Sequence, residues 1–563
     1  MSSRNRLALR LVFSAIALSA LALLAGCGSS SVKATAPPTG GFSDSNLNGT
    51  YVFSAAGADG NGYFIAFAGT FMANGSGGIT GGTVDVNSND PGIGPLLELS
   101  VTGGSYSVGV DGRPSNQAGL LTLQTASGNF TFDFVLSTSE HGLITEFDDI
   151  GSASGTLDLQ ANVTQANING QSYAFSFTGS AGNSSVICTV NFAPSVPPVP
   201  FASAGAFTMD ASDPNLSSGV VDFNNNCLST GVTNLPITSG SVTMPTTAGT
   251  AGTASFTSSA GTFAFDVFPV DATHLKFIEV DALPIVVGDA FTLGSSVNAG
   301  NNVITLGGLD ETNGNPFAAG GLLVTDGNGN ITNASVEDFN DGGTPGEVTS
   351  NIGGTYSALT GGRSVLTLTS GFVNGNGGLG CSNCQFALYP FTNGGTNGMF
   401  LLQIDNAGTS GGAGYAQSTS NTTLASGEGY GVNLSGTANT ADGVFEEDDI
   451  AEFTNTNGNL AGIIDFNDQG QQTSFDQRYA STYTADTTVT GRGTISNQTG
   501  ENAYLLTTYV IDASNVAVVS TDPNFVGIGT FSTQAASSKA NVAQAHLAVL
   551  EARGASRKAV KKH

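Results

Sequence analysis

Apolar and polar side chains alternate along most of the chain, and the pattern is clearest between residues 46 and 163. The positions that show it include Tyr51/Phe53, Tyr63/Ile65/Phe67, Tyr106/Val108/Val110 and Phe130/Phe132/Phe134. A period of two predicts β-strands with one buried face and one face in water. Gly, Asn and Asp cluster between these stretches, which indicates tight turns.

Two sequence markers recur along the chain and define four repeats. The first is a strand that ends in Asp-Val/Phe-Asn, and its aspartates are Asp85, Asp222, Asp338 and Asp465. The second is an apolar stretch that ends in a carboxylate, and its aspartates are Asp149, Asp281, Asp405 and Asp522. Both markers have a period of about 125 residues, which is the size of a domain rather than of a solenoid repeat. The predicted β units are 46–163, 164–300, 301–421 and 422–535.

Each unit should contain about eight strands, with no segment long enough for a crossover helix, so neighbouring strands should pair antiparallel. The fold class is therefore all-β, as four tandem antiparallel meanders. An eight-stranded meander protects its edges by closing into an up-and-down barrel, which we prefer, or by folding into a two-layer sandwich. A large propeller is a third alternative. Gly49-Thr50-Tyr51 resembles the first strand of lipocalin- and avidin-like barrels, which also implies a barrel.

The two ends of the chain differ from the body. Arg4, Arg6 and Arg10 precede an apolar run from Leu11 to Leu24, which suits a signal-peptide core and is too short for a permanent transmembrane helix. Leu24-Ala25-Gly26-Cys27 comes next and resembles the lipobox of bacterial lipoproteins; the alternative is an ordinary secretory signal. The resemblance implies that residues 1–26 are removed and that Cys27 carries a diacylglyceryl group. Gly28 after the cysteine implies sorting to the outer membrane.

Residues 27–45 should form a flexible tether. At the other end, residues 536–563 should form a basic tail with a short helix that begins at Ser537 or Ser538. Contact with anionic lipid, with polysaccharide or with the acidic body is one interpretation of this tail, and a solvated terminus is the other.

Charge is distributed unevenly over the 563 residues. The chain has 43 Asp and Glu against 15 Lys and Arg, and the body between tether and tail holds five of these bases: Arg113, Lys276, Arg363, Arg478 and Arg492. So acidic a body repels nucleic acid, which excludes a nucleic-acid partner. The acidity predicts a hydrated outer surface.

Four cysteines remain besides Cys27, and an exported protein can form disulfides from them. Cys188 could pair with Cys227, and Cys381 with Cys384 in a turn. Asp326, Asn328 and Asn330 alternate like the start of a calcium loop, but Ile331 stands where such a loop needs Gly, so a hairpin turn is preferred. Glu446-Glu447-Asp448-Asp449 is a second place for a cation, although a hydrated loop is the preferred interpretation.

No catalytic residues are predicted. The histidines His141, His274, His546 and His563 lack zinc-site spacing. Gly408-Thr409-Ser410-Gly411-Gly412 matches GxSxG, but a nucleophile elbow needs a strand-to-helix turn, and we expect a glycine-rich loop there. Arg113, Arg363 and Arg492 recur at similar places, so an Asp–Arg pair within each unit is expected to close the fold.

The sequence therefore predicts a non-enzymatic, lipid-anchored structural or adhesive protein of the cell envelope, without a cofactor. Its partners would be the membrane and envelope polysaccharide or a cell surface. Binding of a carbohydrate or a small apolar ligand by the barrels is one alternative function, and hydrolysis of an envelope polysaccharide by paired carboxylates is another.

Overall fold

The computed structural model describes residues 41–181, 200–225, 232–281, 284–310, 314–349, 352–370, 383–440, 443–469, 472–499 and 504–535. All of them fall within one unit of the chain, Thr35–His563. Cys27, Cys188, Cys227, Cys381 and the basic tail lie outside these ranges, so the predictions for them stay predictions. Within these ranges, no helix combines the length and apolarity needed to cross a bilayer.

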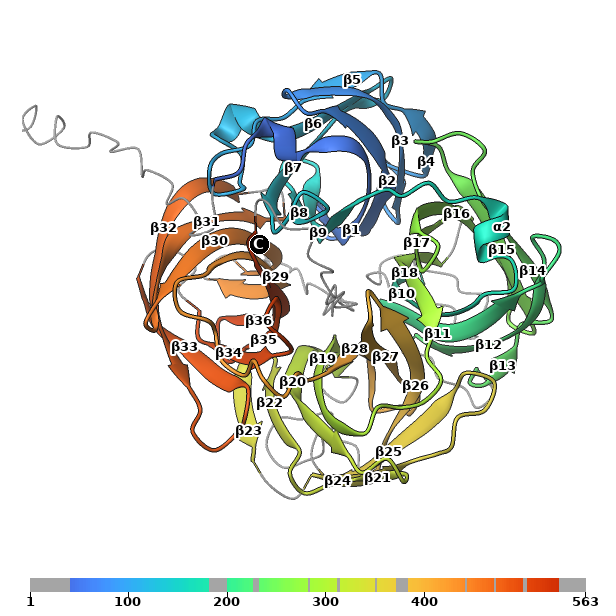
Figure 1. Ribbon diagram of the computed structural model, residues 1–563, viewed down its shortest axis with the longest axis vertical. Helices are drawn as coiled ribbons and strands as arrows, with labels where there is room; N and C mark the ends of the chain where they lie inside the picture. The colour runs from blue at the N-terminus through green and yellow to red at the C-terminus, as the bar shows by residue number, and fades with distance from the viewer. Residues whose placement is uncertain are drawn as a thin grey trace, which may run out of the picture. The chain divides into compact units, whose positions relative to one another are not determined.

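β-Strands make up most of the described chain and helical turns very little of it, which confirms the predicted fold class. Its helical turns are η1 (Asp44–Asn46), η2 (Gln117–Gly119) and α2 (Gln165–Ile168). All of the strand ladders are antiparallel, and they form four successive barrel units (Figure 1). The sandwich and propeller alternatives are therefore replaced by the barrel.

Barrel 1 closes through the circuit β1-β2-β3-β5-β6-β7-β8-β9, with β4 paired to β3 outside it. Its strands are β1 (Asn48–Asp59), β2 (Phe64–Asn74), β3 (Gly78–Ser88), β4 (Leu96–Ser100), β5 (Gly103–Ser105), β6 (Leu121–Thr125), β7 (Gly128–Leu136), β8 (His141–Glu146) and β9 (Gly151–Leu159).

Barrel 2 has the same order, and its first and last strands, β10 and β18, pair directly. Its circuit is completed between β12 and β14 by the isolated bridge Asn215–Ser241 rather than by a ladder. Its strands are β10 (Ser172–Ser180), β11 (Pro200–Met209), β12 (Leu216–Asn224), β13 (Leu235–Pro236), β14 (Ser239–Thr243), β15 (Gly252–Ser258), β16 (Gly261–Asp271), β17 (His274–Glu279) and β18 (Ile285–Leu293).

Barrel 3 closes through β19-β20-β21-β24-β25-β26-β27-β28, and the hairpin β22–β23 extends from β20. A short ladder between β18 and β26 joins it to barrel 2. Its strands are β19 (Gly300–Asp310), β20 (Asn315–Thr325), β21 (Asn330–Ile331), β22 (Val336–Asp341), β23 (Thr344–Val348), β24 (Gly353–Tyr356), β25 (Ser364–Ser370), β26 (Cys384–Asn393), β27 (Thr396–Gln403) and β28 (Gly408–Ala416).

Barrel 4 is a plain eight-stranded up-and-down barrel. Its strands are β29 (Gly429–Thr440), β30 (Gly443–Thr456), β31 (Asn459–Asp468), β32 (Gln472–Ala485), β33 (Arg492–Thr499), β34 (Leu506–Val510), β35 (Asn515–Ser520) and β36 (Phe525–Thr533). The long strand β32 takes the place of the two shorter segments that follow the third strand in barrels 1 and 2, β4 with β5 and β13 with β14.

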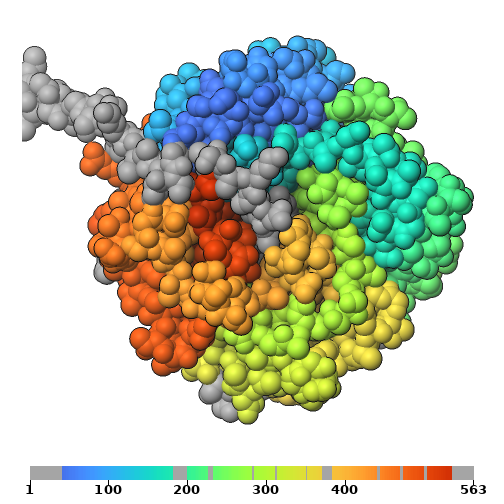
Figure 2. Space-filling model, in the orientation of Figure 1, coloured from blue at the N-terminus to red at the C-terminus, as the bar shows by residue number. Residues whose placement is uncertain are grey.

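Alternation fills each barrel with the predicted apolar side chains. In barrel 1, Phe53 and Phe67 both pack edge-on against Phe132 in one core cluster. The outer faces of the strands are less exposed to water than predicted, because several of them pack against a neighbouring barrel. Val52 and Ala66 on the outside of barrel 1 share an apolar cluster with Phe268 of barrel 2. In Figure 2 barrel 2, in teal and green, directly abuts barrel 3, in yellow-green.

Glycines make the close approach between the first and last strands of a barrel possible. A Cβ atom on Gly57 of β1 would lie 1.8 Å from the carbonyl oxygen of Ser152 in β9. The equivalent distance for Gly412 of β28 is 1.9 Å, to the carbonyl oxygen of Thr305 in β19. Real Cβ contacts are never this short, so a side chain here would push the two strands apart. The abundance of glycine thus has a steric reason at these seams.

We therefore expect Gly57→Val to destabilise the protein by at least about 1–3 kcal/mol, the range for overpacking, or to prevent folding. Gly81→Ala is the matched control, because its new Cβ atom would meet only the Met72 sulfur at 3.5 Å. Urea unfolding followed by circular dichroism measures both. Equal stability of the two variants would contradict the steric role of the seam glycine.

Candidate functional site

The repeated aspartates and arginines meet between barrels rather than within them, which corrects the predicted pairing within each unit. Asp222, on β12 of barrel 2, is completely buried and accepts two hydrogen bonds from Arg363 of barrel 3. The Nε–Oδ2 distance is 2.6 Å and the Nη2–Oδ1 distance is 2.9 Å. The Tyr389 hydroxyl of β26 donates to the same carboxylate. A planar guanidinium suits this two-point contact, which fixes the orientation of the two barrels.

The contact between barrels 3 and 4 has the same construction. Arg492 of β33 donates to Asp338 of β22 through Nε and Nη2, at 2.8 and 2.7 Å. The Tyr509 hydroxyl of β34 donates to Asp338 as Tyr389 does to Asp222. Burial and the neighbouring carboxylate hold the pKa of Tyr509 well above its usual value, so the phenol stays a proton donor. We call each such Asp–Arg pair across barrels a latch.

A third latch returns from barrel 4 to barrel 1. Asp465 of β31 accepts from Arg113, which lies in the connection between β5 and β6 and is 1% exposed. Asp476 is a further partner of Arg113, at 3.4 Å. Burial alone would lower the pKa of Arg113, but Asp465 and Asp133 more than offset it and raise this pKa. The three latches join barrel 2 to barrel 3, barrel 3 to barrel 4 and barrel 4 to barrel 1. The contact between barrels 1 and 2 is the one that remains to complete the circuit.

That last position, between barrels 1 and 2, has a carboxylate but no arginine. Asp85 of β3 is completely buried, and within the described ranges no Lys or Arg forms an ion pair with it. Burial raises the pKa of Asp85, and the neighbouring carboxyl of Asp266, on β16 of barrel 2, raises it further. The fourth interface therefore keeps the acid of the repeat and lacks the base.

A buried asparagine two residues after each aspartate forms the second half of every interface. Asn224 donates through Nδ2 to the carbonyl oxygens of Gln403 and Gly408 in the next barrel, at 2.8 and 2.9 Å. The corresponding asparagines of the other interfaces do the same: Asn87 to Glu279, Asn340 to Asp522 and Phe525, and Asn467 to Glu146 and Gly151. The Asp-Val/Phe-Asn marker is thus an interface motif that occurs in all four barrels.

The second set of repeated aspartates has a local role. Asp281, Asp405 and Asp522 each accept a backbone N–H from the strand alongside, at 2.9, 2.6 and 3.1 Å. In barrel 1 this role belongs to Asp148, which accepts from Thr131, and not to the predicted Asp149, which is exposed. Repeat 1 has two consecutive aspartates, Asp148 and Asp149, and the first of them takes the role that was predicted for the second.

Three non-glycine residues with positive φ serve the interface aspartates. Glu98, Asn234 and Asp476 have φ values of 51°, 56° and 58°, a region that such residues seldom adopt. Each donates its backbone N–H to the aspartate of its own barrel, Asp85, Asp222 and Asp465 respectively. The carboxylate thus holds a strained turn in place on one side and the neighbouring barrel on the other.

The acidity of the body is not simply a hydrated surface, as the composition predicted, because 20 Asp and Glu residues are buried. The run Glu446 to Asp449 lies in strand β30 instead of a hydrated loop, and all four side chains are buried. The Tyr504 hydroxyl donates to Glu447 at 2.5 Å. Burial raises the pKa of Glu452 to about 8 and that of Glu279 to about 9.

Interface residues outside the repeats were not singled out by the sequence. Lys276 of barrel 2 is fully buried and reaches Asp158 of barrel 1 and Asp289 of its own barrel, both at 3.3 Å. His141 contacts Asp158 at 2.7 Å, and His274 contacts Asp289 at 2.6 Å. The scarcity of basic residues in the body could have indicated these interface residues, because four of its five bases lie between barrels: Arg113, Lys276, Arg363 and Arg492. The interface phenols Tyr389 and Tyr509 carried no such signal.

The remaining residues that the sequence analysis considered for chemistry make contacts that stabilise the fold. The Asp326 carboxylate accepts the backbone N–H groups of Asn328 and Asn330, as expected of the preferred turn. Ser410 lies inside strand β28, not in a loop, and its buried hydroxyl donates to Gln403 at 2.8 Å. Cys384 is buried and disulfide-bonded. Within the described ranges, no cluster of three or more His, Cys, Asp or Glu could hold a metal ion.

Comparison with known proteins gives distant structural likenesses alone. No protein-family model and no curated protein matches the chain. A transferrin binding protein B variant from Haemophilus parasuis is 10% identical, with 70% of this chain and 83% of that chain covered, at a TM-score of 0.17. Transferrin binding protein B from Neisseria meningitidis serogroup B is 10% identical, with 71% and 84% covered, at 0.19.

The translocation pore of the P pilus usher PapC is 8% identical, with 87% and 99% covered, at a TM-score of 0.11. Superpositions this loose support no conclusion about this chain. Its function must therefore be inferred from its own residues, above all from those at the interfaces between barrels.

Removing one partner of a latch leaves a buried charge unpaired. We expect Arg363→Gln to destabilise the protein by about 3–5 kcal/mol, since no other base in the described part of the chain contacts Asp222. Arg478→Gln removes the same charge from an exposed position and should change stability by about 0.5 kcal/mol or less. Urea unfolding of both variants checks this. A small effect of Arg363→Gln, equal to that of the control, would show that the latch contributes nothing.

The buried carboxyls predict a stability that falls as pH rises. Because the pKa values of Glu279 and Glu452 are raised on folding, the folded state binds more protons than the unfolded state between the ordinary and the raised pKa values. Their contribution is complete below about pH 4 and is lost on the way to about pH 9. Glu279→Gln should flatten the decline of unfolding free energy over this range, whereas Asp149→Asn at an exposed site should leave the slope unchanged.

Proposed function

We propose that the protein is a lipid-anchored structural or adhesive component of the cell envelope, in which the four barrels act as one body. The observation that carries this proposal is the circuit of interfaces, in which the same aspartate and asparagine positions of every barrel engage the next. Tandem domains that served only as a chain of independent spacers would not need buried contacts from the last barrel back to the first.

The proposed anchor rests on the first residues of the chain. The basic leader, the apolar run and Leu24-Ala25-Gly26-Cys27 occur in the order expected of a bacterial lipoprotein. Acyl chains on Cys27 would hold the protein at a membrane, since each buried methylene contributes about 0.8 kcal/mol. The next residue, Gly28, supports an outer-membrane position. Envelope polysaccharide or another cell surface is the proposed partner.

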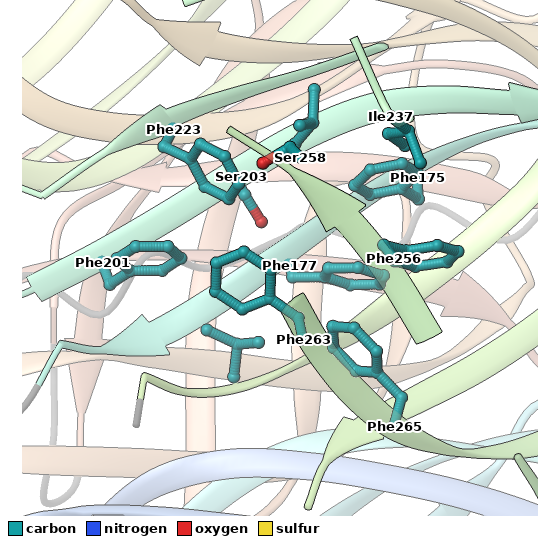
Figure 3. Close-up of a pocket in the computed structure, with 12 residues that line it drawn as sticks. Phe175, Phe177, Phe201, Ser203, Phe223, Ile237, Phe256, Ser258, Phe263 and Phe265 are labelled. Atoms are coloured by element: carbon teal, nitrogen blue, oxygen red, sulfur yellow. The ribbon is translucent and has the colours of Figure 1, made fainter. Parts of the chain in front are cut away.

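The small cavities inside barrels 2 and 4 favour this function over ligand binding within these two barrels. The cavity in barrel 2 measures about 20 Å³ and is lined by phenylalanines that include Phe175, Phe201, Phe223 and Phe263 (Figure 3). The cavity in barrel 4 measures about 10 Å³. Such volumes hold about one water molecule, whereas a small-molecule site occupies roughly 300 Å³ or more. Barrels 2 and 4 therefore offer a partner their outer surfaces rather than their interiors.

The repeated carboxylates also support a structural role rather than glycoside hydrolysis. A glycosidase needs two carboxyl groups that reach the sugar from either side. Asp85, Asp222 and Asp465 are completely buried, and Asp338 is 2% exposed. Their positions are accounted for by contacts between barrels, so no substrate is required to explain them.

Labelling in a diderm bacterial host with a clickable fatty acid tests the anchor. The full-length chain should take up label and sediment with membranes, and Cys27→Ser should do neither. Ser29→Ala, which leaves the Cys27 thiol in place, is the control. Absence of label from the full-length chain would overturn the anchor.

The contact role is tested separately with the purified protein lacking residues 1–26. It should co-sediment with peptidoglycan, with extracted envelope polysaccharide or with whole cells. Lack of binding to all three, together with an unaltered envelope in a deletion strain, would overturn the structural or adhesive role.

A further inference from the structure

The interface between barrels 1 and 2 is the one at which, within the described ranges, no guanidinium lies against the aspartate of the repeat. At the other three, a guanidinium lies against the buried aspartate of the repeat. Here Asp85 instead meets a second carboxyl, that of Asp266. Two adjacent buried carboxylates cannot both be ionised without strong repulsion, so such a pair retains a proton.

Strand register identifies the residue that replaces the arginine. In barrel 4, Arg492 lies directly opposite Tyr509 across the β33–β34 ladder. In barrel 2, the corresponding β15–β16 ladder places Thr253 opposite Asp266. Barrel 2 therefore has threonine where barrel 4 has arginine, and aspartate where barrel 4 has tyrosine. The first change removes the positive charge that neutralises the aspartate in the other latches, and the second replaces a neutral hydrogen-bond donor by another acid.

The other contacts of this interface are compatible with local loosening. Asn87 of barrel 1 donates to the Glu279 carbonyl oxygen at 2.7 Å, and Phe268 packs against the outside of barrel 1. Thr70 and Thr83 of barrel 1 donate to the carbonyl oxygen of Gly249, at 2.8 and 2.9 Å. These contacts carry no charge, so they persist when the carboxyls ionise.

We propose that the contact between barrels 1 and 2 is a pH-sensitive clasp. It is tight while Asp85 and Asp266 share one proton, and it loosens at the Asp85 end when both carboxyls are ionised. The Asp222–Arg363 and Asp338–Arg492 latches stay closed over the same range, because a guanidinium remains charged throughout it. At the third latch Asp133 lies beside Asp465, and burial and that carboxylate raise the pKa of Asp133, so this interface does not serve as a control.

The acids of barrels 1 and 2 near the pair add to the repulsion between the two carboxyls. Glu98, from β4, is the other group that acts on both carboxyls, and its charge adds to the repulsion. Burial and Asp266 raise the pKa of Asp85, although the Glu98 backbone N–H partly offsets this. Glu279, with Asp281 near it, is a further acid of barrel 2 at this interface, and burial raises its pKa also.

The nearest cation is held by other groups. Lys276 pairs with Asp158 and Asp289, and His141 and His274 contact these same two carboxylates. This second charged network lies at the same interface, so a test must separate it from the Asp85–Asp266 pair. Substitutions at Thr253 and Asp266 do so, because the ion pairs of the lysine network involve neither residue.

Hydrogen–deuterium exchange of the protein without residues 1–26, corrected for intrinsic exchange rates, tests the clasp between about pH 5 and about pH 9. Peptides from β3 and β16 should lose about tenfold or more of their protection as pH rises. Peptides around Asp222–Arg363 and Asp338–Arg492, in the same sample, are internal controls and should stay protected.

Two variants make the test specific. Thr253→Arg supplies the missing guanidinium, and Asp266→Asn removes one of the two acids; each should abolish the selective loss of protection. Equal loss at all four interfaces, or no loss at β3 and β16, would overturn the proposal. So would a selective loss that persists undiminished in Asp266→Asn, because the histidine and lysine network would then be its cause. If Thr253→Arg does not fold, Asp266→Asn decides alone.

Discussion

The structure depends on the cost of burying a carboxylate. Each barrel places one aspartate on its outer wall, where contact with the next barrel removes it from water. An ionised carboxylate in such a place is strongly unfavourable unless it is paired and hydrogen-bonded. Barrels 2, 3 and 4 find the required base on their neighbour, so their association and the neutralisation of their buried charge are one event. Orientation is set at the same time, because two-point contact of a guanidinium with a carboxylate allows little freedom.

Local features of this fold could be predicted from the sequence because they depend on neighbours along the chain. The spacing of Phe130, Phe132 and Phe134 indicated a strand with one buried face, and these side chains do fill barrel 1. The recurrence of Asp222 and its equivalents identified the repeat and suggested a structural role. The preference for a barrel came from the number of strands and their short connections, and the strand pairings confirm it.

Contacts between barrels could not be predicted in the same way. Asp222 and Arg363 are 141 residues apart. The recurring arginines, Arg113, Arg363 and Arg492, occupy similar places in their repeats, so the sequence does not say which aspartate each of them meets. Both residue types were therefore evident from the sequence but their partners were not, and pairing within a unit was the wrong choice. The hydrated loop predicted for Glu446 to Asp449 was wrong for a related reason. Four consecutive acids are typical of a solvent-exposed segment, whereas here they lie in a strand between barrels.

The direction of the latches has a consequence for how such a protein can change in length. Each barrel offers an acid on one side and meets its neighbour's acid on the other, so the units relate head to tail, as in a heterologous assembly. Three barrels or five would leave the angle between neighbours wrong for closure, or leave an unmatched carboxylate at a free end. Gain or loss of a single repeat by recombination is thus disfavoured, although the repeats look interchangeable in sequence. Copy number is fixed by the geometry of closure, and the four segments must be inherited together.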